Sequence, residues 1–408
     1  MKTLSLLGST GSVGRNCLRV VEELPGEFRV VALAAGRNTS ELADQVVRFH
    51  PEVVSVSTSE AATQLAQHLK SLDPSVHPEI AVGEEGLLRV ATHPETDLVV
   101  SSIVGVAGLA PTCRAIECGK QIALANKEVL VVAGELVTEL AQRNGVQLIP
   151  VDSEHNAIHQ CLRCGHADEV ARVILTASGG PFLGYSSEQL SRVTPEMALR
   201  HPTWKMGARI TVDSATMMNK GMEVLEARWL FDLDVGQISV WVHPQSIVHS
   251  MVEFVDGSVI AQLGITDMGQ PILYALNYPR RLPGRRPGLD LNQVARLEFM
   301  HPDSGKFPCL DLAYRAAREL GALPCALNAA DEVAVEAFLQ RKIVFAAIPT
   351  IVAKMMEQAK GAGKFSSIAE ILEYDELVRR ETRRLIQKDF SQGARSDDPA
   401  MGIERSSG

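Results

Sequence analysis

The stretch LSLLGSTGSVG, from Leu4 to Gly14, begins with an apolar run and ends in three glycines spaced three residues apart. An amphipathic pattern follows from Val13 to Leu24, so the glycine turn lies between a predicted strand and a predicted helix. Small residues there let a pyrophosphate approach the backbone, and the helix N-terminus offers free N–H groups. The spacing is GxxGxxG rather than GxGxxG, so a tight turn without a ligand is the alternative interpretation.

The first 150 residues continue this alternation of short apolar runs and amphipathic segments. Alternation of strands and helices predicts a parallel sheet covered on both faces. The predicted strands are Leu4–Leu7, Arg29–Ala34, Val53–Val56, Glu79–Val82, Asp97–Ser101, Gln121–Ala125 and Val146–Val151. The predicted helices include Val13–Leu24, Glu41–Phe49 and Leu109–Cys118. We therefore expect an α/β chain whose residues 1–150 form a Rossmann-like, dinucleotide-binding domain.

The rest of the chain predicts an α+β domain and then a helical domain. Strands are expected at Val170–Thr176, Ile238–Val242, Val248–Val255 and Ser258–Leu263, and helices at Asn219–Phe231, Leu310–Leu320, Ala326–Gln340 and Pro349–Gln358. Asp256-Gly257 is a strong hairpin signal, and such a sheet could pair or pack with a copy of itself. The stretch NYPRRLPGRRPG favours a linker. The expected division is a catalytic domain at 151–276, the linker at 277–288, a helical domain at 289–388 and a disordered tail at 389–408.

Composition excludes several classes of protein. The net charge of −9 and the lack of a dominant basic stripe argue against nucleic-acid binding, and the arginines between Arg379 and Arg384 are expected on a solvated helix face. No apolar run approaches the ~20 residues of a membrane span, and the first strand begins without a signal peptide. Seven scattered cysteines predict no disulfide framework. We expect a soluble, cytoplasmic protein without a membrane partner. Cys161-Leu-Arg-Cys164 leaves a redox or metal site open, although structural zinc needs four ligands.

The second predicted strand is followed by AGRNTS, residues 35–40, with no acidic residue. An acid at this point binds the ribose 2′-hydroxyl in many NAD enzymes. Arg37 and the neighbouring hydroxyl groups would instead suit a 2′-phosphate. The pattern favours NADPH over NADH, and an exposed arginine without a ligand is the alternative.

Three further predicted strands end in polar residues. Gln121–Ala125 is followed by Asn126-Lys127-Glu128, and Val146–Val151 by Asp152-Ser153-Glu154. Val170–Thr176 leads to Ser178-Gly-Gly. In an open parallel sheet, ligands bind outside these carboxyl ends. Two acids beside each other repel unless something positive lies there, although helix capping is an alternative for Asp152 and Glu154.

The segment MNKGMEVLEA, residues 218–227, adds a third carboxylate. Asn219, Lys220 and Glu223 can share one side of a helix, yet Gly221 lowers helix stability by roughly 1 kcal/mol relative to alanine. A glycine there suggests that something approaches the backbone closely; a surface Lys–Glu pair is the alternative. Three carboxylates with few nitrogen ligands suit Mg²⁺ or Mn²⁺. His155 and His159 are four residues apart, and we favour packing or orienting roles for them over zinc binding.

Six motifs occur in order: GSTGSVG, LANKEVLV, VDSEHNAI, SGGPF, HPTWKMG and MNKGMEVLEA. Together they resemble the 1-deoxy-D-xylulose 5-phosphate reductoisomerases over about residues 1–388. The resemblance implies a homodimeric oxidoreductase of the non-mevalonate isoprenoid pathway. It would use NADPH and a divalent metal, Mg²⁺ or Mn²⁺ with Co²⁺ as a further candidate, and act on a phosphorylated sugar.

The resemblance also assigns residues to roles. It places the metal carboxylates at Asp152, Glu154 and Glu223. It implies catalytic roles for Lys127, Glu154 and His201, and substrate contacts at Lys127, Ser153, Glu154, Ser178, His201, Trp204, Met206, Ser214, Asn219, Lys220 and Glu223. It implies NADPH contacts at Gly8, Thr10, Gly11, Ser12, Val13, Gly36, Arg37, Asn38, Asn126, Glu128 and Gly207. The stretch HPTWKMG itself, residues 201–207, lacks periodicity yet carries Trp204 and Met206, so we expect a loop that closes over the crevice as a lid; packing of both side chains in the core is the alternative.

Family chemistry implies that the cation explains why the carboxylates lie together. It would chelate adjacent substrate oxygens and stabilise negative charge while carbon–carbon bonds rearrange, by retro-aldol and aldol steps. NADPH would then reduce the resulting aldehyde.

Two other functions are compatible with the glycine turn. A semialdehyde dehydrogenase needs an activated cysteine, and none of the seven lies in such a context with a partnered histidine. An inactive NADPH sensor would have no reason to keep three carboxylates, Lys127 and Lys220. Consumption of NADPH with the expected substrate would separate these possibilities.

Overall fold

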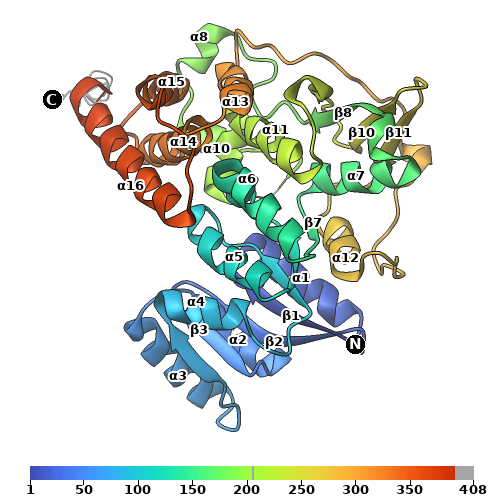
Figure 1. Cartoon of the computed structure of the whole chain (residues 1–408), viewed down its shortest axis with the longest axis vertical. Coiled ribbons are helices and arrows are strands. Elements are labelled where there is room, and N and C mark those ends of the chain that lie inside the picture. Colours follow the sequence, from blue (N-terminus) through green and yellow to red (C-terminus); the bar gives the residue numbers. More distant parts are fainter. Residues whose placement is uncertain (205, 391–408) are drawn as a thin grey trace, which may run out of the picture.

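The structure is a computed structural model that describes residues 1–204 and 206–390 (Figure 1). Lys205 and residues 391–408 lie outside the described part, and with them most of the tail predicted at 389–408. Asp389 and Phe390 close a short π-helical turn, Ile386–Phe390.

The N-terminal region forms the predicted parallel sheet. Its strands lie in the order β4-β3-β2-β1-β5-β6-β7, and every neighbouring pair is parallel. They are β1 (Lys2–Leu7), β2 (Phe28–Ala34), β3 (Val53–Val56), β4 (Glu79–Val82), β5 (Leu98–Ser101), β6 (Gln121–Leu124) and β7 (Leu148–Pro150). The order reverses between β1 and β5, which creates a crevice at the carboxyl ends of these strands.

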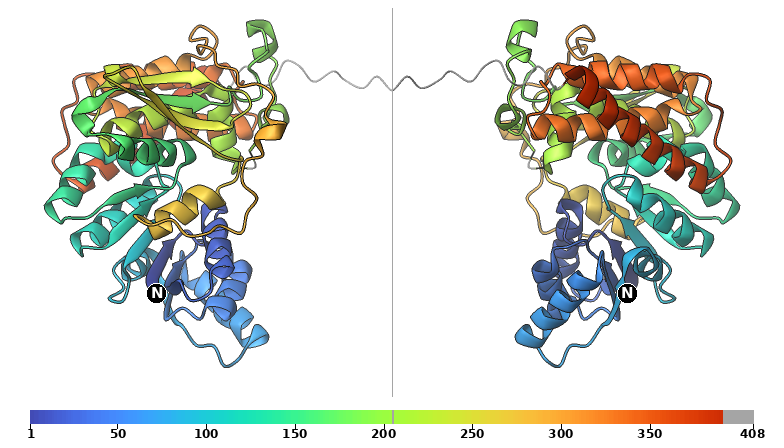
Figure 2. Two further views of the ribbon diagram at one scale, coloured as in Figure 1. Left: turned by 90° about the vertical axis from the view of Figure 1, so that its right-hand side faces the viewer. Right: turned by 90° about the vertical axis from the view of Figure 1, so that its left-hand side faces the viewer.

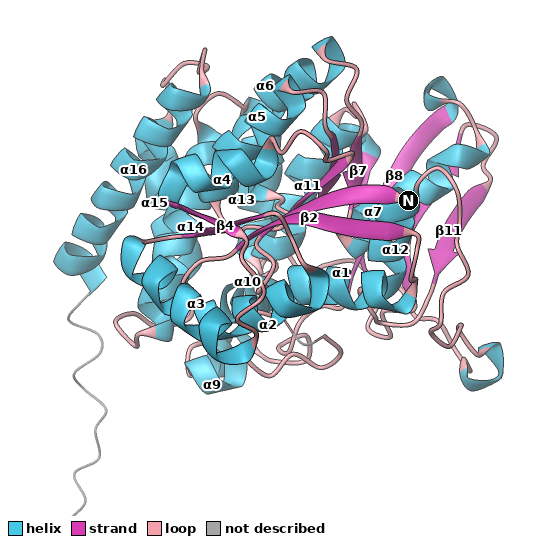
Figure 3. Cartoon of the chain, turned by 90° about the horizontal axis from the view of Figure 1, so that it is seen from below, coloured by secondary structure: helices cyan, strands magenta, loops and turns pink. Residues whose placement is uncertain are grey.

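Helices cover both faces of this sheet (Figure 3). Because successive strand residues point to opposite faces, Leu6 and Leu7 enter two different apolar cores. Leu6 lies in the core with α1 (Ser12–Glu23), α2 (Thr39–Phe49), α3 (Ser59–Leu72) and α12 (Gly269–Asn277). Leu7 lies in the core with α4 (Gly83–Ala91), α5 (Leu109–Glu117) and α6 (Glu128–Arg143). Helix α12 therefore completes a core of the first sheet, although it is far from that sheet in sequence.

A second, mixed sheet follows. It contains β8 (Val170–Ala177), β9 (Ile238–Val242), β10 (Val248–Phe254) and β11 (Val259–Leu263) in the order β11-β10-β8-β9. The predicted hairpin is confirmed, because β10 and β11 are antiparallel and Gly257 between them has φ +85°. Helices α7 (Ser153–Cys161) and α11 (Met218–Leu230) pack on this sheet. The short helices α8 (Ser187–Leu190), α9 (Pro195–Ala198) and α10 (Ala208–Thr216) lie between β8 and α11 in sequence.

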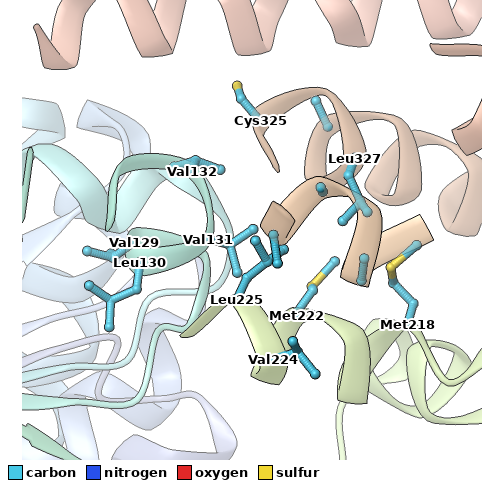
Figure 4. Close-up of a cluster of buried hydrophobic side chains, with 14 of the residues drawn as sticks. Val129, Leu130, Val131, Val132, Met218, Met222, Val224, Leu225, Cys325 and Leu327 are labelled. Atoms are coloured by element: carbon cyan, nitrogen blue, oxygen red, sulfur yellow. The ribbon is translucent and has the colours of Figure 1, made fainter. Parts of the chain in front are cut away.

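The C-terminal region is helical from Pro308 on. It contains α13 (Pro308–Glu319), α14 (Leu323–Leu339), α15 (Ala347–Ala359) and α16 (Ile368–Leu385). Residues 278–307 contain one 3-10 turn, Leu291–Gln293, and Met300 bridges to Val242 at the end of β9. Figure 4 shows apolar side chains of α6, α11 and α14 gathered in one buried cluster. This joint core fixes α11 relative to the first sheet.

Gly221 has a structural explanation. A Cβ at this position would lie 2.5 Å from the Cβ of Ala313 on α13. The close approach inferred from the sequence exists, but what approaches is a packed helix and not a ligand.

Candidate active site

A cavity of about 510 Å³ lies where the carboxyl ends of the first sheet face α10 and α11. Most of the predicted site residues line it. They are Gly11, Ser12, Val13, Asn126, Lys127, Glu128, Asp152, Ser153, Glu154, Ser178, His201, Trp204, Met206, Gly207, Ser214, Asn219, Lys220 and Glu223. Gly8, Thr10, Gly36, Arg37 and Asn38 lie outside the lining, at the ends of β1 and β2.

The glycine turn is tightly packed. A Cβ on Gly8, which has φ +92°, would lie 2.8 Å from the carbonyl oxygen of Ser102, and one on Gly14 would lie 2.3 Å from that of Gly8. Gly8 and Gly14 are thus required by packing alone, whereas a Cβ on Gly11 would lie 3.3 Å from the Gly8 carbonyl oxygen. The first turn of α1, at Ser12 and Val13, nevertheless faces the cavity with the N–H groups that a helix start leaves unpaired.

The loop after β2 lies next to the glycine turn, at the same edge of the first sheet. Arg37 and Ser40 are exposed, whereas Thr39 is buried. The Asn38 side chain caps α2 by accepting a hydrogen bond from the Glu41 backbone at 3.4 Å, and the Glu41 carboxylate pairs with Arg15 at 2.8 Å. Arg37 therefore extends into solvent beside the turn, and Ser40 carries the exposed hydroxyl next to it.

Five charged side chains form the centre of the cavity. Lys127 Nζ lies 2.6 Å from Asp152 Oδ2 and 3.3 Å from Glu223 Oε1. Lys220 contacts Glu223 and lies 3.6 Å from Glu154 Oε1. Glu223 is 1% exposed, so its carboxylate depends on these donors for its stability. Asn219 also donates to Glu223 Oε1, at 2.6 Å.

The cluster rests on two buried groups: His155, for which the sequence favoured a packing or orienting role, and Glu226, to which it assigned none. His155 Nε2 hydrogen-bonds the Glu223 carbonyl oxygen at 2.9 Å, and its Nδ1 lies 3.3 Å from Glu226 Oε2. Burial lowers the pKa of His155, but the carboxylates of Glu226 and Asp152 outweigh burial and raise it to about 9. His155 therefore orients the carboxylates. His159 donates or accepts a 2.7 Å hydrogen bond with Tyr274 and packs between tyrosine rings away from the cluster.

Burial and the neighbouring opposite charges shift the pKa values of the central groups in opposite directions. Burial raises the pKa of Glu154 to about 8 against the pull of Lys220. Burial would also raise the pKa of Asp152, yet Lys127 and His155 hold it well below its usual value. Burial lowers the pKa of Lys127, but the nearby carboxylates, led by Asp152, raise it well above normal. The two lysines thus stay charged and partner the acids.

The donor set fits a hard divalent cation. Potential ligand atoms of Asp152, Glu223 and His155 lie within 4.8 Å of one another. The geometry of His155 opposes ligation, because Nε2 bonds a carbonyl oxygen and Nδ1 faces carboxylates, which leaves no lone pair directed at a cation. Glu154 Oε2 accepts a hydrogen bond from Ser153 Oγ at 2.7 Å, and its Oε1 lies 3.6 Å from Lys220 Nζ, beyond hydrogen-bond distance. Oxygen ligands from these three acids suit Mg²⁺ or Mn²⁺.

His201 and Trp204 cover the other side of the cavity. His201 Nδ1 accepts hydrogen bonds from the backbone N–H groups of Thr203 and Trp204, at 3.2 and 3.0 Å. Because Nδ1 accepts these bonds, the neutral ring carries its proton on Nε2, 3.1 Å from Ser178 Oγ and 3.0 Å from Ser214 Oγ. Burial lowers the pKa of His201, which favours this neutral form. The Trp204 indole is half-buried over the cavity, 6.2 Å from the His249 ring.

Several lining residues were missed by sequence reasoning. They are Ser102, Ile103, Val104, Ala125, Ala177, Gly179, Ala208, Arg209, Ile210, Asp213, Met217, Met222 and Met268. Most are apolar or small and carry no chemical signature. Arg209 lies two residues after the motif HPTWKMG, and this short separation is the one signal in the sequence that could have identified it.

Three family models match successive parts of the chain. The model described as 1-deoxy-D-xylulose 5-phosphate reductoisomerase matches residues 4–134, the C-terminal domain model of the same name matches 148–231, and the DXP reductoisomerase C-terminal domain matches 263–381. The chain belongs to the 1-deoxy-D-xylulose 5-phosphate reductoisomerase family. Curated members agree: the chain is 52% identical to one from Geobacter sp. (strain M21) over 95% of this chain and 99% of that protein. It is 51% identical to one from Chlorobium phaeobacteroides (strain DSM 266 / SMG 266 / 2430) over 95% and 100%.

Solved reductoisomerase structures share the fold. A crystal structure of DOX-P reductoisomerase in complex with NADPH, fosmidomycin and magnesium superposes with a TM-score of 0.89 at 41% identity, over 95% of this chain and 98% of that one. The Zymomonas mobilis reductoisomerase in complex with NADPH gives 0.88 at 39% identity, over 95% and 99%. The predicted fold class and family are therefore confirmed.

Proposed function

We propose that this protein rearranges and reduces 1-deoxy-D-xylulose 5-phosphate to 2-C-methyl-D-erythritol 4-phosphate, with NADPH and a divalent metal ion, in the non-mevalonate isoprenoid pathway. The observation that carries the proposal is the match to one reductoisomerase family from residue 4 to residue 381. The shared cavity supports it, because the glycine turn, three carboxylates and two lysines line one space.

Asp152, Glu154 and Glu223 would hold Mg²⁺ or Mn²⁺. When bound, that ion supplies positive charge to the substrate oxygens on which negative charge develops. Lys127 and Lys220 keep the three carboxylates partnered and add positive charge to the same wall of the cavity. The neutral His201 donates through Nε2, which places a hydrogen-bond donor opposite the acids, between the hydroxyls of Ser178 and Ser214. These groups would bind and orient the phosphorylated sugar.

NADPH supplies the hydride. Its pyrophosphate would lie on the first turn of α1, at Gly11, Ser12 and Val13, and its 2′-phosphate beside Arg37 and Asn38. Asn126 and Glu128, at the end of β6, would contact the cofactor deeper in the cavity, where they approach Lys127. A cofactor bound in this way would extend from the exposed edge of the first sheet to the charged cluster.

The replacement Arg37→Glu is expected to weaken NADPH binding by about tenfold or more, while NADH binding changes little. A charge-assisted bond to phosphate contributes roughly 1.5–3 kcal/mol, and only NADPH carries the 2′-phosphate. The measurement is a titration of the wild type and of Arg37→Glu with NADPH and with NADH. Arg15→Glu would not serve as a control, because Arg15 pairs with Glu41. Equal losses for the two cofactors would show that Arg37 does not contact the 2′-phosphate.

An absorbance assay that follows the oxidation of NADPH directly tests the function itself. We expect NADPH consumption that requires both 1-deoxy-D-xylulose 5-phosphate and Mg²⁺ or Mn²⁺, with 2-C-methyl-D-erythritol 4-phosphate as product. Reduction of NADP⁺ by an aldehyde in the presence of phosphate, with an acyl phosphate as product, would instead indicate a semialdehyde dehydrogenase. NADPH binding without turnover on either substrate would indicate a sensor.

A homodimer is part of the proposal. One face of the second sheet is turned outward (Figure 2). Because successive residues of a strand point to opposite faces, side chains of β9 and β10 lie alternately on this outer face and in the core. Met251, paired with Ile174 and Ala261, lies at its centre, and Val259 at its edge is 48% exposed. Arg172 and Glu253 form a 2.6 Å ion pair on the same face. An apolar centre with a charged rim is typical of interfaces between protein subunits.

Light scattering should give twice the 44.2 kDa of one chain. Met251→Arg should give the single-chain mass, because it puts unpaired positive charges opposite each other at the interface. Arg384→Met, on the distant helix α16, should not change the mass. A wild-type monomer at micromolar concentration, or a dimeric Met251→Arg variant, would contradict this interface.

Among the described helices, none combines the length and the apolar composition that a membrane span requires. All seven cysteines are unpaired, five of them buried. Free thiols are typical of reducing compartments, which supports a cytoplasmic location for the enzyme.

A further inference from the structure

One arginine joins three parts of the chain beside the cavity. Arg209 lies in the first turn of α10, two residues after the lid ends at Gly207, and its side chain is 18% exposed. Its Nη1 lies 2.7 Å from Glu128 Oε1 and 2.8 Å from Glu332 Oε1. Its Nη2 donates to Asn328 Oδ1 at 3.1 Å. We call Arg209, Glu128 and Glu332 the arginine junction.

The junction links α10, which carries Arg209, to α6 and to α14, which carry Glu128 and Glu332. Glu128 begins α6 and follows Lys127 directly, so its carboxylate lies in the cavity wall beside the charged cluster. Glu332 lies on α14 in the C-terminal region and is not among the residues that line the cavity. Glu332 Oε2 is bound in turn by Arg379 Nη1 at 2.8 Å, which extends the contact to α16.

Each carboxylate in this junction is held in one place by the guanidinium. The guanidinium is planar and rigid, and its Nη1 contacts both carboxylates while Nη2 binds Asn328, so the group keeps Glu128 and Glu332 close to each other. Glu128 is 8% exposed, and an acid so buried needs its partner to stay in place. A shift of α14 would therefore move Arg209, and Arg209 would move the carboxylate of Glu128.

We propose that Arg209 is a positioning residue for the cofactor: it orients Glu128, and through Glu332 it makes NADPH binding depend on the C-terminal helices. The inference rests on the proposed function, since it takes Glu128 as a cofactor contact. A neutral side chain at Arg209 leaves Glu128 without a cation and free to turn toward Lys127, which alters the cavity wall on the cofactor side. Glu332 acts on the same carboxylate although it touches no ligand.

The alternative is that the junction only braces the C-terminal helices against the rest of the protein. A brace affects the melting temperature and leaves the cofactor dissociation constant unchanged. Arg315 provides a matched control, because its side chain is 22% exposed and binds Glu319 at 3.0 Å and Glu357 at 2.5 Å without lining the cavity.

The experiment measures the NADPH dissociation constant by cofactor fluorescence, and the melting temperature, for Arg209→Gln, Arg209→Lys, Glu332→Gln and Arg315→Gln in the full-length protein. We expect the dissociation constant to rise about tenfold in Arg209→Gln and about threefold in Glu332→Gln, as the loss of charged hydrogen bonds implies. Arg209→Lys should fall between the wild type and Arg209→Gln, because lysine keeps the charge but not the fork. Arg315→Gln should match the wild type in NADPH affinity.

A double variant shows whether Arg209 acts through Glu128. If it does, Glu128→Gln with Arg209→Gln binds NADPH no more weakly than Glu128→Gln alone, because the acid to be oriented is gone. Additive losses would overturn the inference.

Other outcomes are equally decisive. Unchanged affinity in Glu332→Gln, with a lowered melting temperature, would show that the junction is a brace. If Arg209→Gln does not fold, Arg209→Lys and Glu332→Gln decide the question, since both keep part of the junction. A wild-type protein that binds no NADPH would instead refute the proposed function, so the two failures are distinguishable.

Discussion

Glu223→Gln is expected to reduce kcat by about a thousandfold, which corresponds to roughly 4 kcal/mol at the barrier. Glutamine has nearly the same size, so the helix and its packing should remain. The change removes a negative charge from a side chain that is 1% exposed and contacts both Lys127 and Lys220. Breaking such a buried pair lowers the stability of the folded protein by about 3–5 kcal/mol because the partner charges stay buried, so the melting temperature should fall as well. One proposed metal ligand is weakened at the same time.

The measurement combines turnover with a Mg²⁺ titration and circular dichroism. Glu117→Gln is a suitable control, since Glu117 forms an exposed pair with Arg114 on α5, far from the cavity. Turnover and Mg²⁺ affinity equal to those of the wild type would remove Glu223 from the metal site. Loss of the helical signal would assign the effect to folding instead.

Trp204→Ala should lower kcat/KM by about one to two orders of magnitude, or about 1.4–2.7 kcal/mol, with almost no change in melting temperature. The indole is half-buried and lines the cavity, so its removal admits water to the charged cluster without opening a core. Excluding water strengthens the fields of the lysines and the metal around the substrate.

Fluorescence offers an independent measurement of the same residue. Trp204 emission should change when substrate or a chelating inhibitor binds, once Trp229 and Trp241 are replaced by phenylalanine. Trp229 packs across Gly134, and the Trp241 ring packs at a tilt against His301, so the emission of both reports on other parts of the protein. Intact catalysis in Trp204→Ala, together with a large fall in melting temperature, would show that Trp204 stabilises the core and does not act as a lid.

The sequence was sufficient for the first sheet and for the polar ends of its strands. Val53–Val56, Glu79–Val82 and Ile238–Val242 have the predicted bounds, because each is a short apolar run between turn residues. Lys127 and Asp152 follow neighbouring parallel strands, so their proximity was predictable from strand order alone.

Other features depend on the folded chain. Residues 208–216, ARITVDSAT, are rich in β-branched side chains, yet they form α10, where Thr211 Oγ1 donates to the Gly207 carbonyl oxygen and Arg209 is held by two acids. Tertiary contacts here outweigh local propensity. The approach of Lys127 to Glu223 spans 96 positions of sequence, and a single sequence carries no record of such a pair.

Helix α12 has a consequence for biosynthesis. Ile272, Ala275 and Leu276 fill the core beneath β1 and α1, and Lys2 donates to the Leu276 carbonyl oxygen at 2.7 Å. The nucleotide-binding sheet therefore lacks part of its interior until the ribosome has added more than a hundred residues beyond the last strand of that sheet. Contacts of such long sequence separation slow folding, because the loop between them must close first. We expect the apolar side chains that α12 covers to stay exposed on the nascent N-terminal half until residues 269–277 have been synthesised.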